Sequence, residues 1–143
     1  MSKPAGDLET VRAYFNTHDQ LARQLGIEVV EVAPGRARAR MRLEQKHYNG
    51  VSVAHGGAIF TLADLAFAAA SNTHGTVALA INANISYLKA ATAGVLTAEA
   101  EELCLTPKLG TYSVRIINEE QETIAVFQGT VYRKKDPLPL REG

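Results

Sequence analysis

The stretch from residue 53 to residue 75 constrains the fold more than any other part of this chain. It reads V-A-H-G-G-A-I-F-T-L-A-D-L-A-F-A-A-A-S-N-T-H-G, and between Ala58 and Ala70 its only ionisable side chain is that of Asp64. A helix that is apolar on every side belongs in the interior of a domain rather than on its surface. The stretch therefore predicts one central helix around which the remaining elements are arranged.

The two ends of the predicted helix and its single carboxylate indicate where a ligand could bind and where the helix ends. His55, Gly56 and Gly57 leave the first turn without bulky side chains, so that its free backbone N–H groups can be approached closely. Gly75 suits a left-handed cap beyond the other end. Burying Asp64 among apolar neighbours is unfavourable unless the carboxylate has a partner or a chemical role.

His55 and Asp64 are nine positions apart, which prevents them from acting together within one copy of the helix. At ~100° per residue they lie about half a turn out of phase. At ~1.5 Å per residue they are roughly 13 Å apart along the axis, and Gly56 is only slightly closer to the carboxylate. A site that combines the glycine turn with Asp64 would come from two antiparallel copies of the helix, and we expect a homodimer with two composite sites.

The remaining periodicity predicts one helix before the central helix and six strands around it. Apolar and alternating runs of strand length place two strands before the central helix and four after it. An antiparallel sheet wrapped around the long central helix satisfies this order, which makes the fold class α+β. The first helix is predicted over 7–25, and the strands over 27–32, 36–43, 76–88, 95–105, 110–118 and 123–132.

The length of 143 residues suits a single domain with a core of its own. We expect one domain over residues 1–143, with its core over about 20–133 and a loose C-terminal tail over 134–143. Cys104, within a predicted strand, is expected to be a small packing residue. The strand over 76–88 alternates clearly, and its apolar face is expected to lie on the core. That face comprises Val77, Leu79, Ile81, Ala83, Ile85 and Tyr87.

Four arginines share one face of the strand predicted over 36–43, and small or apolar residues share the other. A phosphate-binding stripe and a solvated strand face are both compatible with this pattern. Glu28, Glu31 and Glu44 lie close enough in sequence to balance the charge, and charged faces also protect sheets, which favours the solvated face. The arginines are Arg36, Arg38, Arg40 and Arg42.

The charge balance and cysteine content exclude several classes of function. Fifteen basic and fifteen acidic residues give a formal charge of zero, whereas a nucleic-acid-binding protein usually has a basic excess. A single cysteine forms no internal disulfide, and we expect a cytoplasmic protein. The central helix is too short for a membrane span and is interrupted by Asp64. We therefore expect neither nucleic acid nor membrane as a partner.

The run from His47 to Asp64, H-Y-N-G-V-S-V-A-H-G-G-A-I-F-T-L-A-D, resembles the hotdog-fold acyl-CoA thioesterases. The similarity is greatest to the phenylacetate-degradation thioesterase (PaaI-like) family. That family combines a His-x-Asn loop, a His-Gly-Gly turn and an Asp nine positions after the second His. S-N-T-H-G after the helix and S-Y-L-K-A at the end of the next strand also resemble it, and the likeness covers roughly residues 20 to 133.

The resemblance implies a role for each matching residue. Asp64 corresponds to the catalytic carboxylate, which either activates water or attacks the thioester. Gly56 corresponds to the residue whose backbone N–H polarises the thioester carbonyl. Gly57 is a predicted substrate-binding residue because, with Gly56, it keeps the helix terminus sterically open. Asn49 corresponds to a side chain that holds this carbonyl or the water, and His55 to a positioning group beside the turn.

Two lysines near predicted strand ends are candidate contacts for the phosphates of coenzyme A. Lys89 and Lys108 stand where the diphosphate could lie at the surface, although ordinary solvated lysines would give the same pattern. Many relatives carry Arg-Pro where this chain has Lys89-Ala90, and Arg-Arg where it has Pro107-Lys108.

These features predict a thioester hydrolase that releases a free acid and CoA, with phenylacetyl-CoA and other aryl or medium-chain acyl-CoA molecules as candidate substrates. Two alternatives remain open: another hotdog enzyme, such as a hydratase or dehydratase, and a non-catalytic acyl-CoA-binding module. We expect no cofactor and no metal, because His47, His55 and His74 lack the clustering of a zinc site. The expected assembly is a homodimer, or a homotetramer formed as a dimer of dimers.

Taken singly, the same residues have structural interpretations. Asp64 could cap a neighbouring loop or bond a buried amide. His55 could be a structural hydrogen-bonding residue, and Asn49 an ordinary turn residue. Gly56 and Gly57 could merely allow close helix packing.

Overall fold

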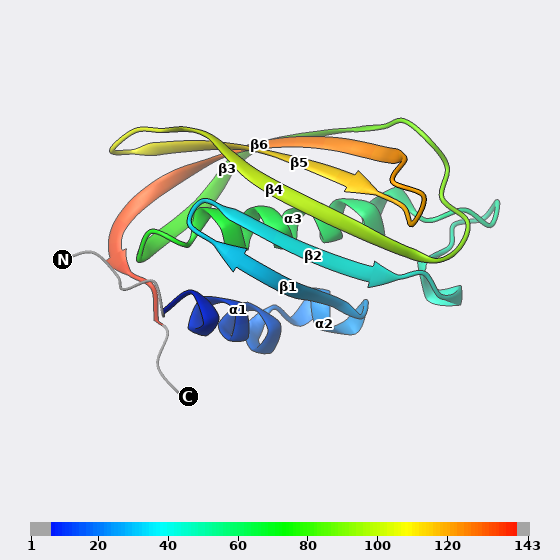
Figure 1. The fold of residues 1–143 in the computed structure, drawn as a ribbon, viewed down its shortest axis with the longest axis horizontal. Coiled ribbons are helices and arrows are strands. Elements are labelled where there is room, and N and C mark those ends of the chain that lie inside the picture. The colour runs from blue at the N-terminus through cyan, green and yellow to red at the C-terminus, as the bar shows by residue number, and fades with distance from the viewer. Residues whose placement is uncertain (1–6, 140–143) are drawn as a thin grey trace.

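A computed structural model, which describes residues 7–139, shows a six-stranded antiparallel sheet curved around one long helix (Figure 1). The central helix is α3 (Gly56–Ser71), and the strand order is β1-β2-β4-β5-β6-β3. This confirms the predicted α+β class. The other elements are α1 (Asp7–His18), α2 (Gln20–Gln24), β1 (Ile27–Ala33), β2 (Arg36–Arg42), the 3-10 turn η1 (Gln45–His47), β3 (Thr76–Tyr87), β4 (Val95–Leu105), β5 (Leu109–Ile117) and β6 (Thr123–Pro137).

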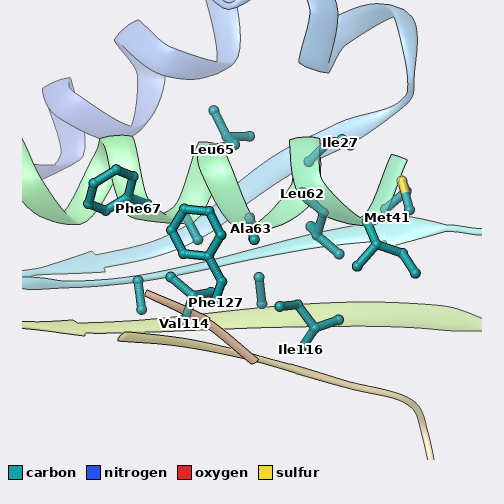
Figure 2. Close-up of a cluster of buried hydrophobic side chains, with 14 of the residues drawn as sticks. Ile27, Met41, Leu62, Ala63, Leu65, Phe67, Val114, Ile116 and Phe127 are labelled. Atoms are coloured by element: carbon teal, nitrogen blue, oxygen red, sulfur yellow. The ribbon is translucent and has the colours of Figure 1, made fainter. Parts of the chain in front are cut away.

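The core lies between α3 and the inner face of the sheet. Alanines and two large side chains of α3, Leu62 and Phe67, are buried against side chains of the strands (Figure 2). Phe67 packs edge-on against Tyr112 and also contacts Phe127. Gly129 of β6 lies so close to α3 that a methyl group added to it would come within 2.6 Å of the Phe67 ring. Small residues on both elements therefore set the distance between helix and sheet.

The end of α3 is tied to the start of β3 by a buried asparagine. The Asn72 side chain donates to the carbonyl of Ala68 at 2.8 Å and accepts from the backbone N–H of Ala78 at 3.0 Å. Gly75, in the connecting turn, has a φ of 92°, a left-handed conformation that glycine adopts without strain. No helix within residues 7–139 has the length and apolar character needed to cross a membrane.

The prediction that the apolar face of β3 lies on the core is wrong for this chain. Leu79 is 52% exposed and Ile81 is 60% exposed. Among the strands of residues 7–139, β3 is an edge strand that pairs only with β6, and a register shift between Ala80 and Asn82 interrupts its alternation. Sequence alternation shows which side chains share a face, but it does not show whether anything covers that face.

Three further predictions differ from the structure. The predicted first helix is two helices, because Asp19 is extended and its side chain accepts from Ala22 N–H at 3.1 Å as the N-cap of α2. Cys104 is exposed, because a register shift after Glu102 moves it off the core-facing positions of β4. The tail is not loose from residue 134, since β6 continues to Pro137, which pairs with Thr76. Residues 140–143 lie outside the described residues.

The arginine-bearing face of β2 is solvated, as favoured from the sequence. Its arginines are exposed, while Ala37, Ala39 and Met41 are buried. The guanidinium of Arg38 pairs with Glu31 of β1 at 3.0 Å, so β1 supplies part of the charge balance. This face lies on the opposite side of the sheet from α3.

The two edges of the sheet differ in how their backbone groups are satisfied. At the β1 edge the Asn16 side chain of α1 donates to the Val29 carbonyl at 2.9 Å and accepts from Val29 N–H at 2.8 Å. β3 has no strand on its outer side within residues 7–139. A long unprotected edge with exposed apolar side chains is a surface on which another strand can pair.

The close approach of α3 to β6 generates a stability prediction. We expect Gly129→Ala to lower the free energy of unfolding by about 1–3 kcal/mol, because the new methyl group overlaps the buried Phe67 ring. Gly50→Ala is the matched control, since a methyl group there meets no atom within 4 Å. Urea unfolding measures both, and equal stability of the two variants would contradict this packing.

Candidate active site

The N-terminus of α3 presents an open backbone donor. His55 is the N-cap, and its Nδ1 accepts from Gly57 N–H at 2.8 Å. The His55 carbonyl accepts from Ala58 and Ile59. Gly56 N–H has no acceptor within residues 7–139, so it is the first-turn donor available to a ligand. The Gly57 donor, in contrast, is already used.

The loop that leads into α3 is anchored by a buried histidine. His47 Nδ1 accepts from Glu44 N–H at 2.8 Å, and its Nε2 lies 2.7 Å from the carbonyl of Leu25, to which it donates. His55 N–H in turn donates to the His47 carbonyl at 2.7 Å. His47 thus acts structurally, by fixing the approach of the chain to the glycine turn.

Asn49 combines a turn role with a free donor. Its Oδ1 accepts from Val51 N–H at 3.0 Å and from Val53 N–H at 3.2 Å. Because both partners are donors, the oxygen must face them, and Nδ2 has no acceptor within the described chain. The turn interpretation is therefore correct for the oxygen and leaves the amide nitrogen for another partner.

A surface hollow of about 330 Å³ brings several of these groups together. It lies beside the first turn of α3, where the loop before the helix meets the end of β3. The predicted residues Asn49, Gly56 and Lys89 line it, and so does Tyr87. Asp64 and Lys108 are not among its lining residues.

Tyr87 was not predicted as a site residue, because it ended an apolar strand pattern. Its hydroxyl donates to the Gly56 carbonyl at 2.9 Å. Its ring lies over the glycine, so that a methyl group added to Gly56 would meet the ring at 3.1 Å. Partial burial raises the pKa of Tyr87, which keeps the hydroxyl protonated as a donor. The sequence did contain one indication of this role, because Tyr87 is the only aromatic residue on the apolar face of the strand predicted over 76–88.

Asp64 lies on the one partly accessible stripe of an otherwise buried helix. Gly57, Thr61, Asp64 and Ala68 follow each other at helical spacing along this stripe. Burial raises the pKa of the Asp64 carboxyl, and the negative charge of Asp19 raises it further. The carboxylate has no hydrogen-bond partner within the described chain, so the structural interpretations of Asp64 find no support.

Within one chain, the structure places Asn49, Gly56 and Lys89 around the hollow, but it does not place Asp64 and Lys108 there. By the rise per residue, Gly56 and Asp64 lie roughly 12 Å apart along α3. Lys89 pairs with Glu122 at 2.6 Å near the end of β3. Lys108 precedes β5, whose first residue Leu109 lies in register with Tyr132, the partner of Leu79 near the start of β3. The two lysines therefore mark opposite ends of β3.

Comparison with known proteins identifies the family. Residues 52–125 match the Thioesterase superfamily, a segment that includes the glycine turn, Asp64 and Tyr87. The chain belongs to the thioesterase superfamily. A protein of Archaeoglobus fulgidus is 42% identical over 139 residues, which cover 96% of this chain and 90% of that protein.

Two comparisons concern the acyl-coenzyme A thioesterase PaaI of Escherichia coli. Its sequence is 36% identical over 128 residues, covering 85% of this chain and 91% of the relative. The solved E. coli PaaI structure superimposes with a TM-score of 0.89 at 32% identity, covering 94% of this chain and 99% of that one. The predicted hotdog fold and the predicted family are both confirmed.

The environment of Asp64 generates a prediction about its ionisation. We expect the pKa of Asp64 to lie above its usual 3.8, and Asp19→Asn to lower it by removing a nearby negative charge. Asparagine is an equally good N-cap, so α2 should be retained. Carboxyl carbon NMR titration measures the pKa, with the exposed Glu120→Gln as control. An unchanged pKa in Asp19→Asn would remove Asp19 as a cause.

Proposed function

We propose that this protein hydrolyses acyl-CoA thioesters, with phenylacetyl-CoA and other aryl or medium-chain acyl-CoA molecules as its substrates. The observation that carries the proposal is the free Gly56 N–H at the start of α3, beside a hollow lined by Asn49, on a helix that also carries the half-buried Asp64. The similarity to an acyl-coenzyme A thioesterase across most of the chain supports it.

The first chemical requirement is stabilisation of the oxyanion that forms at the thioester carbonyl. A helix N-terminus carries unpaired N–H groups and a partial positive charge, and both favour a developing negative charge. We assign the donor to Gly56 N–H, with Asn49 Nδ2 as a second group that holds the carbonyl or the water. His55 positions the turn through its bond to Gly57 N–H, and Gly57 keeps the turn sterically open.

The second requirement is an activated nucleophile. A poorly solvated carboxylate with a raised pKa is a stronger base than an exposed one. As a base, Asp64 takes a proton from water while the water oxygen bonds to the carbonyl carbon. The C–S bond then breaks, and the CoA thiolate takes up a proton. In the alternative step Asp64 attacks the carbonyl carbon, the C–S bond breaks and the CoA thiolate leaves and takes up a proton. Water then hydrolyses the resulting anhydride, which releases the free acid and restores the Asp64 carboxylate.

One chain cannot bring these groups to a single carbonyl. A reacting carbonyl must lie about 3 Å from both the donors and the nucleophile, whereas Gly56 and Asp64 lie roughly 12 Å apart on α3. The unpaired edge and exposed apolar residues of β3 support pairing with a second copy. We therefore assign Asn49 and Gly56 to one subunit and Asp64 to the other in a homodimer. A tetramer formed as a dimer of dimers belongs to the same proposal, and sedimentation equilibrium distinguishes it by mass.

The same dimer accounts for the separation of the two lysines. If two copies of β3 pair antiparallel, the Leu79 end of one strand meets the Tyr87 end of the other. Lys89 of one subunit and Lys108 of the second would then flank the same site and could share the CoA phosphates. Lys89 would exchange its pairing with Glu122 for one with phosphate.

The two alternative functions are less well supported. A hydratase or dehydratase would need Asp and His close together in one chain, but His55 is exposed and its Nδ1 is bound to Gly57. A non-catalytic acyl-CoA-binding module would not need a half-buried carboxylate on the accessible stripe of α3. Release of free thiol from bound acyl-CoA separates this module from an enzyme.

We expect wild-type protein to release free thiol from acyl-CoA, and Asp64→Asn to lower kcat by about 10²-fold or more, as for a lost acid or base group. The exposed Asp136→Asn is the matched control. The assay uses short-chain, medium-chain, long-chain and aryl acyl-CoA molecules. No release above background from any of them would contradict the proposed function, and normal turnover by folded Asp64→Asn would contradict the role of Asp64.

The stability of Asp64→Asn provides a check on folding. A carboxyl whose pKa is raised by folding stabilises the protein most below its usual pKa, and this contribution is lost as the pH rises through the raised value. At neutral pH the asparagine removes the unfavourable ionisation. We therefore expect the melting temperature of Asp64→Asn to equal or exceed that of wild type. A loss of activity in this variant could then not be attributed to a loss of folded structure.

Mixing two inactive variants tests the composite site. Asp64→Ala and Asn49→Ala are unfolded and refolded together, so that their subunits exchange. In a mixed dimer one site carries both lesions and the other carries neither, and we expect activity to recover to roughly a quarter of wild type under random mixing. Verified mixed dimers without activity would show that Asn49 and Asp64 do not act across the interface.

A further inference from the structure

We propose that the hydroxyl of Tyr87 is a positioning group that holds the Gly56–Gly57 turn in the orientation needed to stabilise the oxyanion. This inference rests on the proposed function. It assigns a role to a residue at the end of β3 whose side chain contacts the turn but supplies no hydrogen bond to the reacting carbonyl.

The argument begins with the peptide unit between Gly56 and Gly57. Its carbonyl oxygen accepts from the Tyr87 hydroxyl at 2.9 Å, and its N–H donates to His55 Nδ1 at 2.8 Å. Side chains therefore hold this peptide plane at both ends. The preceding peptide unit is held on one end only, since the His55 carbonyl accepts from Ala58 and Ile59 while Gly56 N–H has no acceptor in the part of the chain that the structure describes.

Glycine makes this restraint necessary. Gly56 has no Cβ, so its backbone torsions are less restricted than those of any other residue. The same lack of Cβ is required here, because a methyl group on Gly56 would meet the Tyr87 ring at 3.1 Å. Gly56 N–H lies in the preceding peptide plane, which is joined to the following plane through the φ and ψ torsions of Gly56. The bonds from Tyr87 and His55 restrain the following plane in addition to the helix backbone, and preorganised donors stabilise an oxyanion better than mobile ones.

The backbone of Tyr87 is itself well placed to act as a fixed support. Tyr87 pairs with Ala125 of β6, and the next two backbone N–H groups, of Leu88 and Lys89, donate to the Ile124 carbonyl at 2.8 and 3.2 Å. The tyrosine thus projects from the end of a hydrogen-bonded strand. Through its hydroxyl, Tyr87 links β3 to the first turn of α3 by a side-chain hydrogen bond to the Gly56 carbonyl.

Tyr87→Phe tests the hydroxyl while retaining the ring that covers Gly56. Tyr132→Phe is the matched control, since Tyr132 is exposed on β6 and makes no side-chain hydrogen bond within the described chain. We expect Tyr87→Phe to lower kcat by roughly 3- to 10-fold, the effect of one neutral hydrogen bond. KM should stay within about 2-fold of wild type, because an interaction made in the transition state affects kcat rather than ground-state binding.

A spectroscopic measurement separates positioning from a general structural effect. A ketone analogue of the substrate, in which CH₂ replaces the thioester sulfur and the carbonyl carbon is ¹³C, is bound to each variant. The infrared C=O stretch falls when the donor polarises the carbonyl, and we expect it to rise again in Tyr87→Phe but not in Tyr132→Phe.

The outcomes distinguish this inference from the proposed function. Active wild-type protein with equal kcat and equal C=O stretch in both tyrosine variants would overturn the role of Tyr87 alone. A parallel fall in kcat and melting temperature without a change in the C=O stretch would show a structural role and would also overturn it. Wild-type protein that hydrolyses no thioester would overturn the function and the inference together.

Discussion

The packing of α3 against the inner face of the sheet is the constraint on which the rest of the structure depends. Alanines on the helix and Gly129 on β6 allow the two surfaces to approach until Phe67 is fully enclosed. This burial leaves one partly accessible stripe along α3, and Asp64 lies on it. Asp64 is only partly accessible there, and this burial raises the pKa of its carboxyl.

A second constraint follows from the sheet order. The chain protects its β1 edge with Asn16 but leaves β3 without an outer partner within residues 7–139. β3 ends at Tyr87, which contacts the glycine turn. If a second copy pairs along this edge, as we propose, one strand links the interface to the oxyanion donor. Assembly and catalysis would then depend on the same element, and each chain would supply half of two sites.

The central elements could be predicted from sequence because their signals are local. The apolar composition of α3 predicts a buried helix, and its glycine turn and single carboxylate are the candidate functional groups. The family resemblance adds Asn49 as a candidate site residue. The sequence did not reveal the exposure of β3 or of Cys104, because both depend on strand order and on register shifts between distant segments. It also missed the effect of the Asp19 charge on Asp64 and the hydrogen bond from Tyr87 to Gly56, since only the tertiary fold brings these residues together.

The central claim is that a second copy of the chain pairs along β3 and completes the site. NMR on dimers mixed from isotope-labelled and unlabelled chains tests it most directly, because isotope filtering selects contacts between the two copies. The account predicts intermolecular nuclear Overhauser effects from the Leu79 or Ile81 methyl groups, which are exposed in the single chain, to β3 of the other copy. Intermolecular contacts confined to other elements, or a protein that remains monomeric at the concentrations where it hydrolyses thioesters, would contradict it.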